Sequence, residues 1–181
     1  LKKLFSYFKK NKIYLNGLIN NAGQRQRKSF IDFTKKDIEQ IIKVNFVSTF
    51  LLTQLFVKNS KNHGESIVNI GSIVGEKPFS NLVGYASSKS AVSGFTKSLA
   101  LELAEKKINI RVNCINPGFT KTSYFKKFKK NKKLYNWTIS KIAAERWADS
   151  FEISKLAIFL LSDKSSYING QIINIDGGWK Y

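Results

Sequence analysis

Residues Gly71–Lys89 read GSIVGEKPFSNLVGYASSK, and the rest of the interpretation is built on the spacing within this stretch. Ser72 stands 13 residues before Tyr85, and Lys89 follows Tyr85 by four residues. If Tyr85 begins a helix, the phenol and the ammonium lie on one face, one turn apart. If Ser72 ends a strand, its hydroxyl can reach the same point.

These three side chains are the parts of a proton-transfer site. A tyrosine titrates near ~10, so it is a poor base at neutral pH. A nearby ammonium favours the phenolate, and we expect Lys89 to move the pKa of Tyr85 toward the working range. The Ser72 hydroxyl can hold a carbonyl or alkoxide oxygen. Because a Tyr and a Lys four apart are also common on helices without a catalytic role, the flanking segments must decide between the two interpretations.

The segments before this stretch alternate between helix and strand signals. Residues Leu1–Lys12 are typical of the end of an amphipathic helix, and Ile13–Ile19 of a short apolar strand. That strand runs into Asn20-Asn21-Ala22-Gly23, whose small residues let a ligand come close. Thr34 and Asp37 form a capping-box pattern that begins a helix running to about Lys58. Asn45 interrupts the apolar face of that helix, as a satisfied core amide or as part of a site.

The later segments continue the alternation. The predicted elements are strand Ser66–Ile70, helix Tyr85–Lys106, strand Ile108–Ile115 ending at Asn116-Pro117-Gly118, a helix from Asp149 and Glu152 through Leu161, and strand Gly170–Ile175. Strands that alternate with helices predict an α/β fold with a doubly wound parallel sheet. Functional residues are expected at the carboxyl ends of such strands. Without internal repeats or low-complexity linkers, residues 1–181 are predicted to form a single domain.

The formal net charge of +19 comes from 31 basic and 12 acidic residues. Such an excess can indicate a nucleic acid, an anionic membrane or an acidic partner. However, 27 of the basic residues are Lys, and Asn and Ile are also abundant, which is typical of AT-rich coding sequence. A non-catalytic basic module that binds a polyanion therefore stays open as an alternative from another class, although nucleic acid is not the expected partner.

Cysteine content and hydropathy favour a cytoplasmic protein. The single Cys114 cannot form an internal disulfide, which fits a reducing compartment. No apolar run is expected to reach the ~18 residues that span a bilayer, and residues 1–10 are too short and too charged for a signal peptide. No membrane partner is expected.

Taken together, these motifs resemble the short-chain dehydrogenase/reductase family. The resemblance rests on their order and spacing over nearly the whole chain: Asn20-Asn21-Ala22-Gly23, Asn45, Ser72, Tyr85-x-x-x-Lys89, Asn116-Pro117-Gly118 and Asp176-Gly177-Gly178. It implies a Rossmann-like oxidoreductase that uses NAD or NADP to interconvert a secondary alcohol and a ketone. Family members usually form dimers or tetramers through the helices that correspond to Thr34–Lys58 and Tyr85–Lys106.

The resemblance also implies a role for individual residues. Tyr85 would be the general acid/base, Lys89 would lower its pKa and bind the nicotinamide ribose, Ser72 would hold the substrate oxygen, and Asn45 would help to hold a proton-relaying water. The remaining expected cofactor contacts are Asn20, Ala22, Gly23, Pro117, Gly118, Thr120 and Thr122. The family usually has Ile or Val where Thr120 stands.

The front of the chain departs from the family pattern. Family members begin with a strand and a Gly-x-x-x-Gly-x-Gly turn whose amides cradle the pyrophosphate, and no such turn occurs in this sequence. We expect a domain that lacks the first strands of the fold, with a cofactor choice that the sequence does not reveal. The strand Ile13–Ile19 is then expected to be an exposed sheet edge.

The substrate is the least determined property. The residues Gly23–Lys28, Glu145-Arg146-Trp147 and Asp-Gly-Gly-Trp are similar to the sugar-acid group, such as gluconate 5-dehydrogenases and 2-deoxy-D-gluconate 3-dehydrogenases. In that comparison Arg27 would contact a substrate carboxylate through its guanidinium, or it belongs to a solvated loop. The alternative enzyme is a 3-oxoacyl-[acyl-carrier-protein] reductase, whose acidic carrier would suit the seven lysines between Lys121 and Lys133.

Overall fold

A computed structural model describes residues 2–123 and 125–180. Its main elements, in chain order, are α1 Lys2–Lys10, β1 Gly17–Asn20, α2 Lys35–Ile42, α3 Ser48–Lys58, β2 Glu65–Ile70, α4 Val83–Glu105, β3 Ile110–Pro117, β4 Thr120–Lys121, α5 Phe125–Lys129, α6 Lys132–Ser140, β5 Ala148–Asp149, α7 Ser150–Leu161 and β6 Ile172–Ile175. Leu1, with which the first predicted helix begins, and Tyr181 lie outside the described residues.

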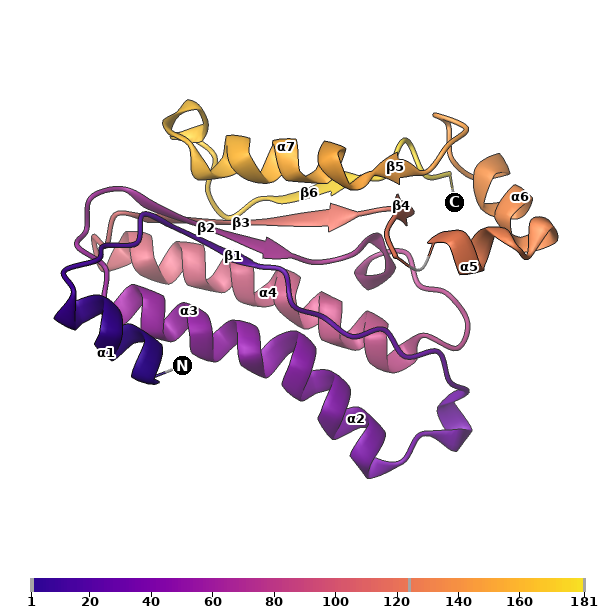
Figure 1. The fold of residues 1–181 in the computed structure, drawn as a ribbon, viewed down its shortest axis with the longest axis horizontal. Coiled ribbons are helices and arrows are strands. Elements are labelled where there is room, and N and C mark those ends of the chain that lie inside the picture. Colours follow the sequence, from indigo (N-terminus) through magenta and orange to yellow (C-terminus); the bar gives the residue numbers. More distant parts are fainter. Residues whose placement is uncertain (1, 124, 181) are drawn as a thin grey trace.

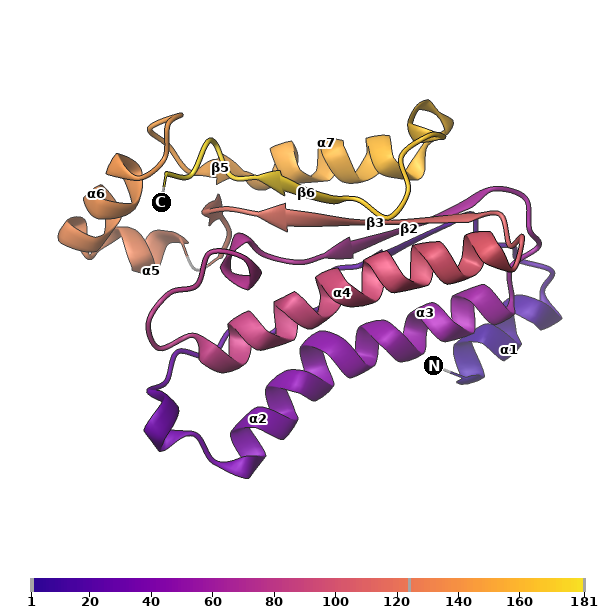
Figure 2. The same ribbon diagram turned by 180° about the vertical axis from the view of Figure 1, so that it is seen from behind.

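The predicted parallel sheet is present. Four strands pair in the order β1-β2-β3-β6, all parallel, with Ile67 opposite both Leu18 and Val112. Helices α1, α3 and α4 cover one face and α7 covers the other (Figures 1 and 2). The fold is therefore the three-layer α/β arrangement expected of a Rossmann-like domain.

Each face of the sheet has its own apolar core, because adjacent residues of a strand point to opposite sides. Ile67 packs with Val112 and Phe56 on the α3–α4 side. Val68, the next residue, packs with Leu160 of α7 on the other side. Both Ile67 and Val68 are fully buried, so this strand is covered on both faces of the sheet.

Strand β1 lies at an edge of the four-stranded sheet, as expected. Among the described strands it pairs only with β2, and Ile19 is 42% exposed. The strand begins at Gly17 rather than at the predicted Ile13, because pairing starts only where Gly17 meets Ser66. Residues 13–16 precede the first paired residue and remain coil.

The predicted helix Thr34–Lys58 is one helical stretch with an irregular centre. Thr34 and Asp37 form the expected capping box, but Lys43–Val47 is a π-helical turn between α2 and α3. The stretch Lys35–Lys58 is also long and apolar enough to cross a membrane by length and composition, which differs from the sequence expectation. A core helix of a globular domain can meet the same criterion, and this one buries Ile41, Thr53 and Phe56 against the domain.

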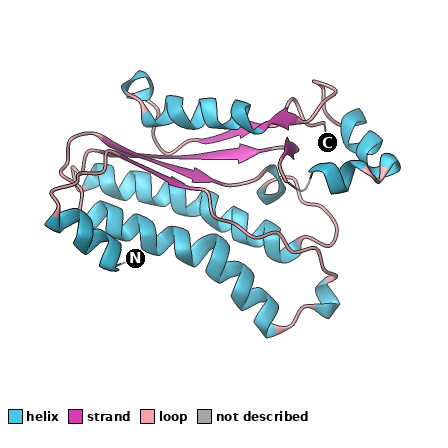
Figure 3. Ribbon diagram, in the orientation of Figure 1, coloured by secondary structure: helices cyan, strands magenta, loops and turns pink. Residues whose placement is uncertain are grey.

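The basic segment after β3 contains structure that the sequence analysis did not predict. Residues 120–149 form the short strands β4 and β5, which pair in parallel, and the helices α5 and α6. These helices lie beyond the carboxyl ends of the strands, where the arrowheads in Figure 3 point. The segment thus covers part of the edge at which functional residues are expected.

Candidate active site

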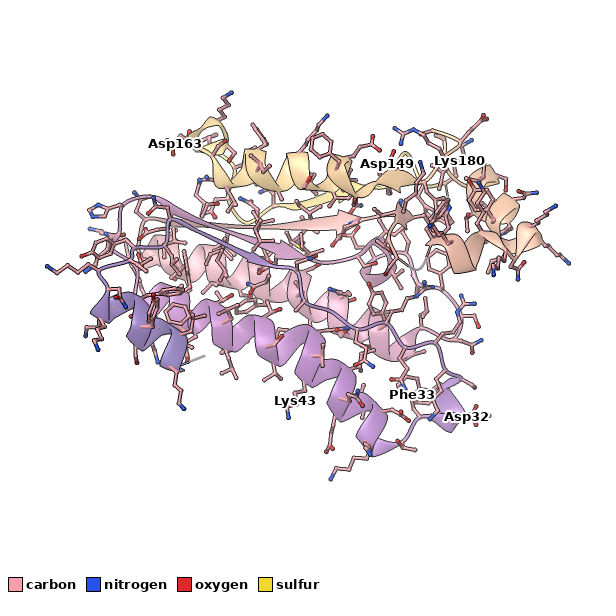
Figure 4. The ribbon with its side chains drawn as sticks, viewed as in Figure 1. Asp32, Phe33, Lys43, Asp149, Asp163 and Lys180 are labelled. Carbon is pink, nitrogen blue, oxygen red and sulfur yellow. The ribbon has the colours of Figure 1, made fainter. Side chains whose placement is uncertain are left out.

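The predicted site residues converge on the carboxyl edge of the parallel sheet. Asn20 ends β1, Ser72 follows β2 by two residues, and Pro117 ends β3. In Figure 4, Asp149 and Lys180 lie at this end of the molecule and Asp163 lies at the opposite end of α7. Helix α4, which begins at Val83, carries Tyr85 in its first turn and Lys89 one turn later.

Ser72 and Tyr85 form the centre of the site. Ser72 is 8% exposed and precedes a short 3-10 turn, Ile73–Gly75, where its Oγ accepts a hydrogen bond from the N–H of Val74 at 3.2 Å. A hydrogen bond between the Ser72 side chain and Tyr85 favours the phenolate, as does the charge of Arg25. Burial acts more strongly in the opposite direction, so the pKa of Tyr85 is raised above its ordinary value.

The net shift of the Tyr85 pKa is thus upward, with burial as its largest cause, and the lowering of this pKa by Lys89 stays a prediction. Lys89 is 4% exposed, and its Nζ donates to the carbonyl of Ile70 at 2.7 Å. Burial lowers the pKa of Lys89, and an electrostatic interaction with Cys114 opposes this shift. The sequence spacing placed the ammonium one turn from the phenol, but it could not reveal that the side chain is drawn toward the end of β2.

Asn45 lies in the π-helical turn, a feature that often marks functional positions. The residue is fully buried, and its Oδ1 accepts from the N–H of Gln24 at 2.7 Å. Its Nδ2 donates to the carbonyl of Gln24 at 2.9 Å and to Ser88 Oγ at 2.8 Å. The side chain therefore ties the loop after β1 to α4 as a satisfied buried amide, and the role of Asn45 in holding a proton-relaying water stays a prediction.

The Asn20-Asn21-Ala22-Gly23 turn passes directly over Lys89. A Cβ at Gly23 would lie 3.4 Å from Lys89 Nζ and 3.6 Å from Asn45 Oδ1. Asn20 is buried and donates to Asn69 Oδ1 at 2.8 Å, whereas Asn21, Ala22 and Gly23 are exposed. The small residues thus leave an open surface beside the buried ammonium.

The other expected cofactor residues follow β3 along the same edge. The N–H of Gly118 donates to the carbonyl of Ile175 at 2.9 Å, and Thr120 Oγ1 donates to the carbonyl of Gly118 at 3.1 Å. A Cβ at Gly118 would lie 2.7 Å from the Cα of Asp176, so this close approach requires glycine. Pro117 and Thr120 are partly buried and Thr122 is exposed.

Two features of the site were missed by the sequence analysis. Arg25 is an arginine whose charge acts on Tyr85, whereas Arg27, predicted to contact a substrate carboxylate, is exposed in the same loop. A group of aromatic side chains also packs at this end of the sheet, including Phe79, Phe119 and Trp179, with the Phe79–Trp179 ring centroids 5.5 Å apart. The tryptophans were visible in the sequence, but their shared location depended on how residues 119–147 fold.

The donor set at this edge fits a nicotinamide cofactor. An ammonium carries three N–H donors, and in the described structure one of those on Lys89 is directed at Ile70. The other N–H donors of Lys89 lie beside the exposed turn of small residues, where a ribose with two hydroxyls can be accommodated. The phenol of Tyr85 and the hydroxyl of Ser72, which interact with each other, lie at the same strand edge and can share a substrate oxygen.

Comparison with known proteins agrees with this geometry. A family profile described as "Enoyl-(Acyl carrier protein) reductase" matches residues 1–180. The 3-oxoacyl-[acyl-carrier-protein] reductase FabG of Buchnera aphidicola subsp. Schizaphis graminum is 40% identical over 163 residues, which are 89% of this chain and 65% of the relative. The 2-dehydro-3-deoxy-D-gluconate 5-dehydrogenase of Bacillus subtilis is 37% identical over 164 residues, 90% of this chain and 63% of the relative.

The fold is also similar to solved structures. The crystal structure of a gluconate 5-dehydrogenase from Burkholderia cenocepacia J2315, in complex with NADP and tartrate, superposes with a TM-score of 0.91 at 27% identity. The match covers 98% of this chain and 69% of that one. The chain thus spans a little under two thirds of the length of the two curated relatives above.

Proposed function

The chain belongs to the short-chain dehydrogenase/reductase family, and on that premise we propose that it interconverts a secondary alcohol and a ketone with NAD or NADP, acting on a sugar acid or a polyol. The observation that carries this proposal is the convergence of three side chains at one strand edge: Ser72 just after β2, Tyr85 in the first turn of α4, and the buried ammonium of Lys89, which donates to the carbonyl of Ile70. A phenol, a hydroxyl and an ammonium at one strand edge can bind a reacting oxygen and move its proton.

Each of the three side chains has a separate task. The Ser72 hydroxyl holds the carbonyl or alkoxide oxygen of the substrate. Tyr85 donates a proton to that oxygen during reduction and accepts it during oxidation. The raised pKa of Tyr85 favours the protonated phenol, which is the form that reduction requires. Arg25 supplies a positive charge that makes the phenolate accessible in the reverse direction.

When bound, the nicotinamide cofactor supplies or accepts the hydride. Lys89 and Tyr85 would hold its ribose hydroxyls, and Asn20, Ala22 and Gly23 would lie against its adenosine side. Pro117, Gly118 and Thr120 would border the nicotinamide, with Thr122 near the pyrophosphate. Asn45, by bonding Gln24, holds the loop that follows this turn in place.

For the substrate, the proposal is a sugar acid whose carboxylate is bound by Arg27. The sugar-acid names among the relatives support this class, and a guanidinium can bind a carboxylate through two hydrogen bonds.

The test is reduction of 5-ketogluconate by NADH or NADPH in the full-length enzyme. Ser72→Ala is expected to lower kcat by about 10²-fold, whereas Ser98→Ala, on an exposed position of α4, is the matched control. Equal activity of both variants would reject the role of Ser72.

A second candidate is a 3-oxoacyl-[acyl-carrier-protein] reductase. It is favoured by the identity to the Buchnera relative and by five exposed lysines on and between α5 and α6: Lys126, Lys129, Lys130, Lys132 and Lys133. An acidic carrier bound there would have a KM that rises steeply with salt. A preference for acetoacetyl-carrier protein over 5-ketogluconate, lost when these lysines become serine, would establish this candidate instead.

We further propose that the enzyme is a cytoplasmic homo-oligomer assembled through α3 and α4. These helices leave Phe50, Leu51 and Leu101 exposed by 41%, 46% and 62%, and exposed apolar surface of this kind can mark an interface between subunits. Leu51→Glu combined with Leu101→Glu should give monomers in light scattering, whereas Ile31→Glu, at an 88% exposed position elsewhere, should not. An unchanged mass in the double variant would contradict this interface.

A further inference from the structure

The backbone of Ser72 is held by a side chain from the neighbouring strand. Its N–H donates to Oδ1 of Asn116, a fully buried residue of β3, at 3.0 Å. The contact is tight, because a Cβ at Gly71 would lie only 2.0 Å from the same oxygen. The amide of Asn116 thus packs directly against the peptide that leads from β2 to the serine.

Glu76 determines which end of this amide faces Ser72. A side-chain amide has an acceptor oxygen and a donor NH₂ group, whereas an ionised carboxylate only accepts. Nδ2 of Asn116 donates to Oε1 of Glu76 at 3.1 Å, which leaves Oδ1 directed at the N–H of Ser72. The other carboxylate oxygen accepts from Nδ2 of Asn174 at 3.0 Å, and Asn174 is paired with Asn116 across β3 and β6.

The same short turn carries both the serine and the carboxylate. Glu76 follows Ser72 by four residues, and its N–H donates to the carbonyl of Ile73 at 3.0 Å. Ser72, Asn116 and Glu76 are therefore joined in a ring: hydrogen bonds lead from Ser72 to Asn116 and on to Glu76, and the backbone leads from Glu76 back to Ser72. A flipped amide would set two donors, its NH₂ group and the Ser72 N–H, against each other, so only one orientation satisfies every group.

We infer that Asn116 and Glu76 are positioning residues of this site: the carboxylate of Glu76 orients the amide of Asn116, which holds the Ser72 backbone so that its hydroxyl meets Tyr85. The inference rests on the proposed function, since it assigns to both residues the placement of the group that holds the substrate oxygen. Neither residue touches the reacting atoms.

The direct test is to measure, by NMR, the rate of hydrogen exchange at the backbone amide of Ser72 in the protein of residues 1–181. Asn116→Ala and Glu76→Leu are each expected to accelerate exchange at Ser72 by about five- to tenfold, the loss of one net hydrogen bond. Glu76→Gln keeps an acceptor for Asn116 and should restore most of the protection. The amides of Val68 and Val112, in the centre of the sheet, report whether a variant has lost global stability instead.

A second readout follows the phenol itself. Because the hydrogen bond with Ser72 favours the phenolate, Asn116→Ala and Glu76→Leu should raise the pKa of Tyr85 in the same direction as Ser72→Ala does. Lys77→Met is the matched control, since Lys77 lies next to Glu76 but bonds the carbonyl of Trp179 at 3.2 Å instead of Asn116.

The two readouts separate this inference from the proposed function, because neither requires turnover. Faster exchange at Ser72 with a shifted Tyr85 titration, in the Asn116 and Glu76 variants but not in Lys77→Met, supports positioning even in a protein without oxidoreductase activity. Unchanged exchange at Ser72 in Glu76→Leu overturns the inference even if the enzyme is active. An equal response to Lys77→Met overturns it as well, since the effect would then belong to the whole turn.

Discussion

Replacing Gly71 with alanine is expected to destabilise the protein and to disturb the site in one step. The added Cβ would lie 2.0 Å from Oδ1 of Asn116 and 2.9 Å from Sγ of Cys114. Because real Cβ contacts essentially never fall below 3.0 Å, the buried amide must move by about 1 Å. It cannot do so and keep its hydrogen bonds to Ser72 and Glu76.

The size of the effect follows from these groups. Losing the hydrogen bond from Asn116 to Glu76 costs about 1 kcal/mol, and the loss of its other bond strands the buried N–H of Ser72, which costs about 1–3 kcal/mol. We expect Gly71→Ala to lower the free energy of unfolding by about 2–4 kcal/mol, a large share of the ~5–15 kcal/mol typical of a domain. Gly94, in the middle of α4, is the matched control, since a Cβ there would meet nothing within 4 Å.

The assay is urea denaturation followed by tryptophan fluorescence and circular dichroism. Gly94→Ala should raise the free energy of unfolding by about 0.5–1 kcal/mol, because alanine loses less backbone entropy in a helix. If Gly71→Ala were within about 1 kcal/mol of the parent protein, the close packing of Asn116 on this peptide would be refuted. Equal destabilisation by both alanines would refute it too.

Three further predictions concern titration and capping. Burial raises the pKa of the Cys114 thiol to about 11 from 9.0, so the folded state keeps this proton longer than the unfolded chain and stability falls as pH rises through this window; Cys114→Ala should abolish about 2–3 kcal/mol of the loss measured between about pH 9 and 11. Arg25→Gln should raise the pKa of Tyr85 further, seen by NMR of isotope-labelled tyrosine, while Arg27→Gln should not; equal shifts would contradict the placement of Arg25. Thr34→Ala should lower the free energy of unfolding by about 1 kcal/mol through loss of the capping box, and an unchanged denaturation midpoint would count against that cap.

The sheet could be predicted from sequence because its signals are local. Ile67 and Val68 belong to a short segment rich in β-branched residues that is bounded by Gly64 and Gly71, and such a segment predicts a strand. The carboxyl-end rule for parallel strands then placed Asn20 and Ser72 on one edge, as the structure has them. The order of the strands along the chain was sufficient to predict that these two residues share an edge of the sheet.

The electrostatics of the site could not be predicted in the same way. The four-residue spacing between Tyr85 and Lys89 is local, but burial of the phenol depends on residues distant in sequence and reverses the expected direction of its pKa shift. Asn45 likewise lies in a π-helical turn and bonds Gln24 and Ser88, residues that only the tertiary structure brings beside it.

The contacts around Ser72 were beyond sequence reasoning for a related reason. Asn116 and Glu76 are 40 residues apart, and Asn116 was noted only as part of a turn signal. Nothing in the local pattern shows that its amide points across to the neighbouring strand end. The basic segment gave no clear periodicity either, so α5 and α6 and the aromatic side chains they contribute became visible only in the structure.

The central claim is that the Tyr85 phenol moves the substrate proton, and the most direct measurement is kcat of Tyr85→Phe in the full-length enzyme. The expected result is a loss of about 10²–10⁴-fold, with nearly unchanged affinity for the nicotinamide cofactor, because only the proton donor is removed. Tyr167→Phe, at a fully exposed tyrosine, should retain the parent rate. Retained turnover in Tyr85→Phe would contradict the account.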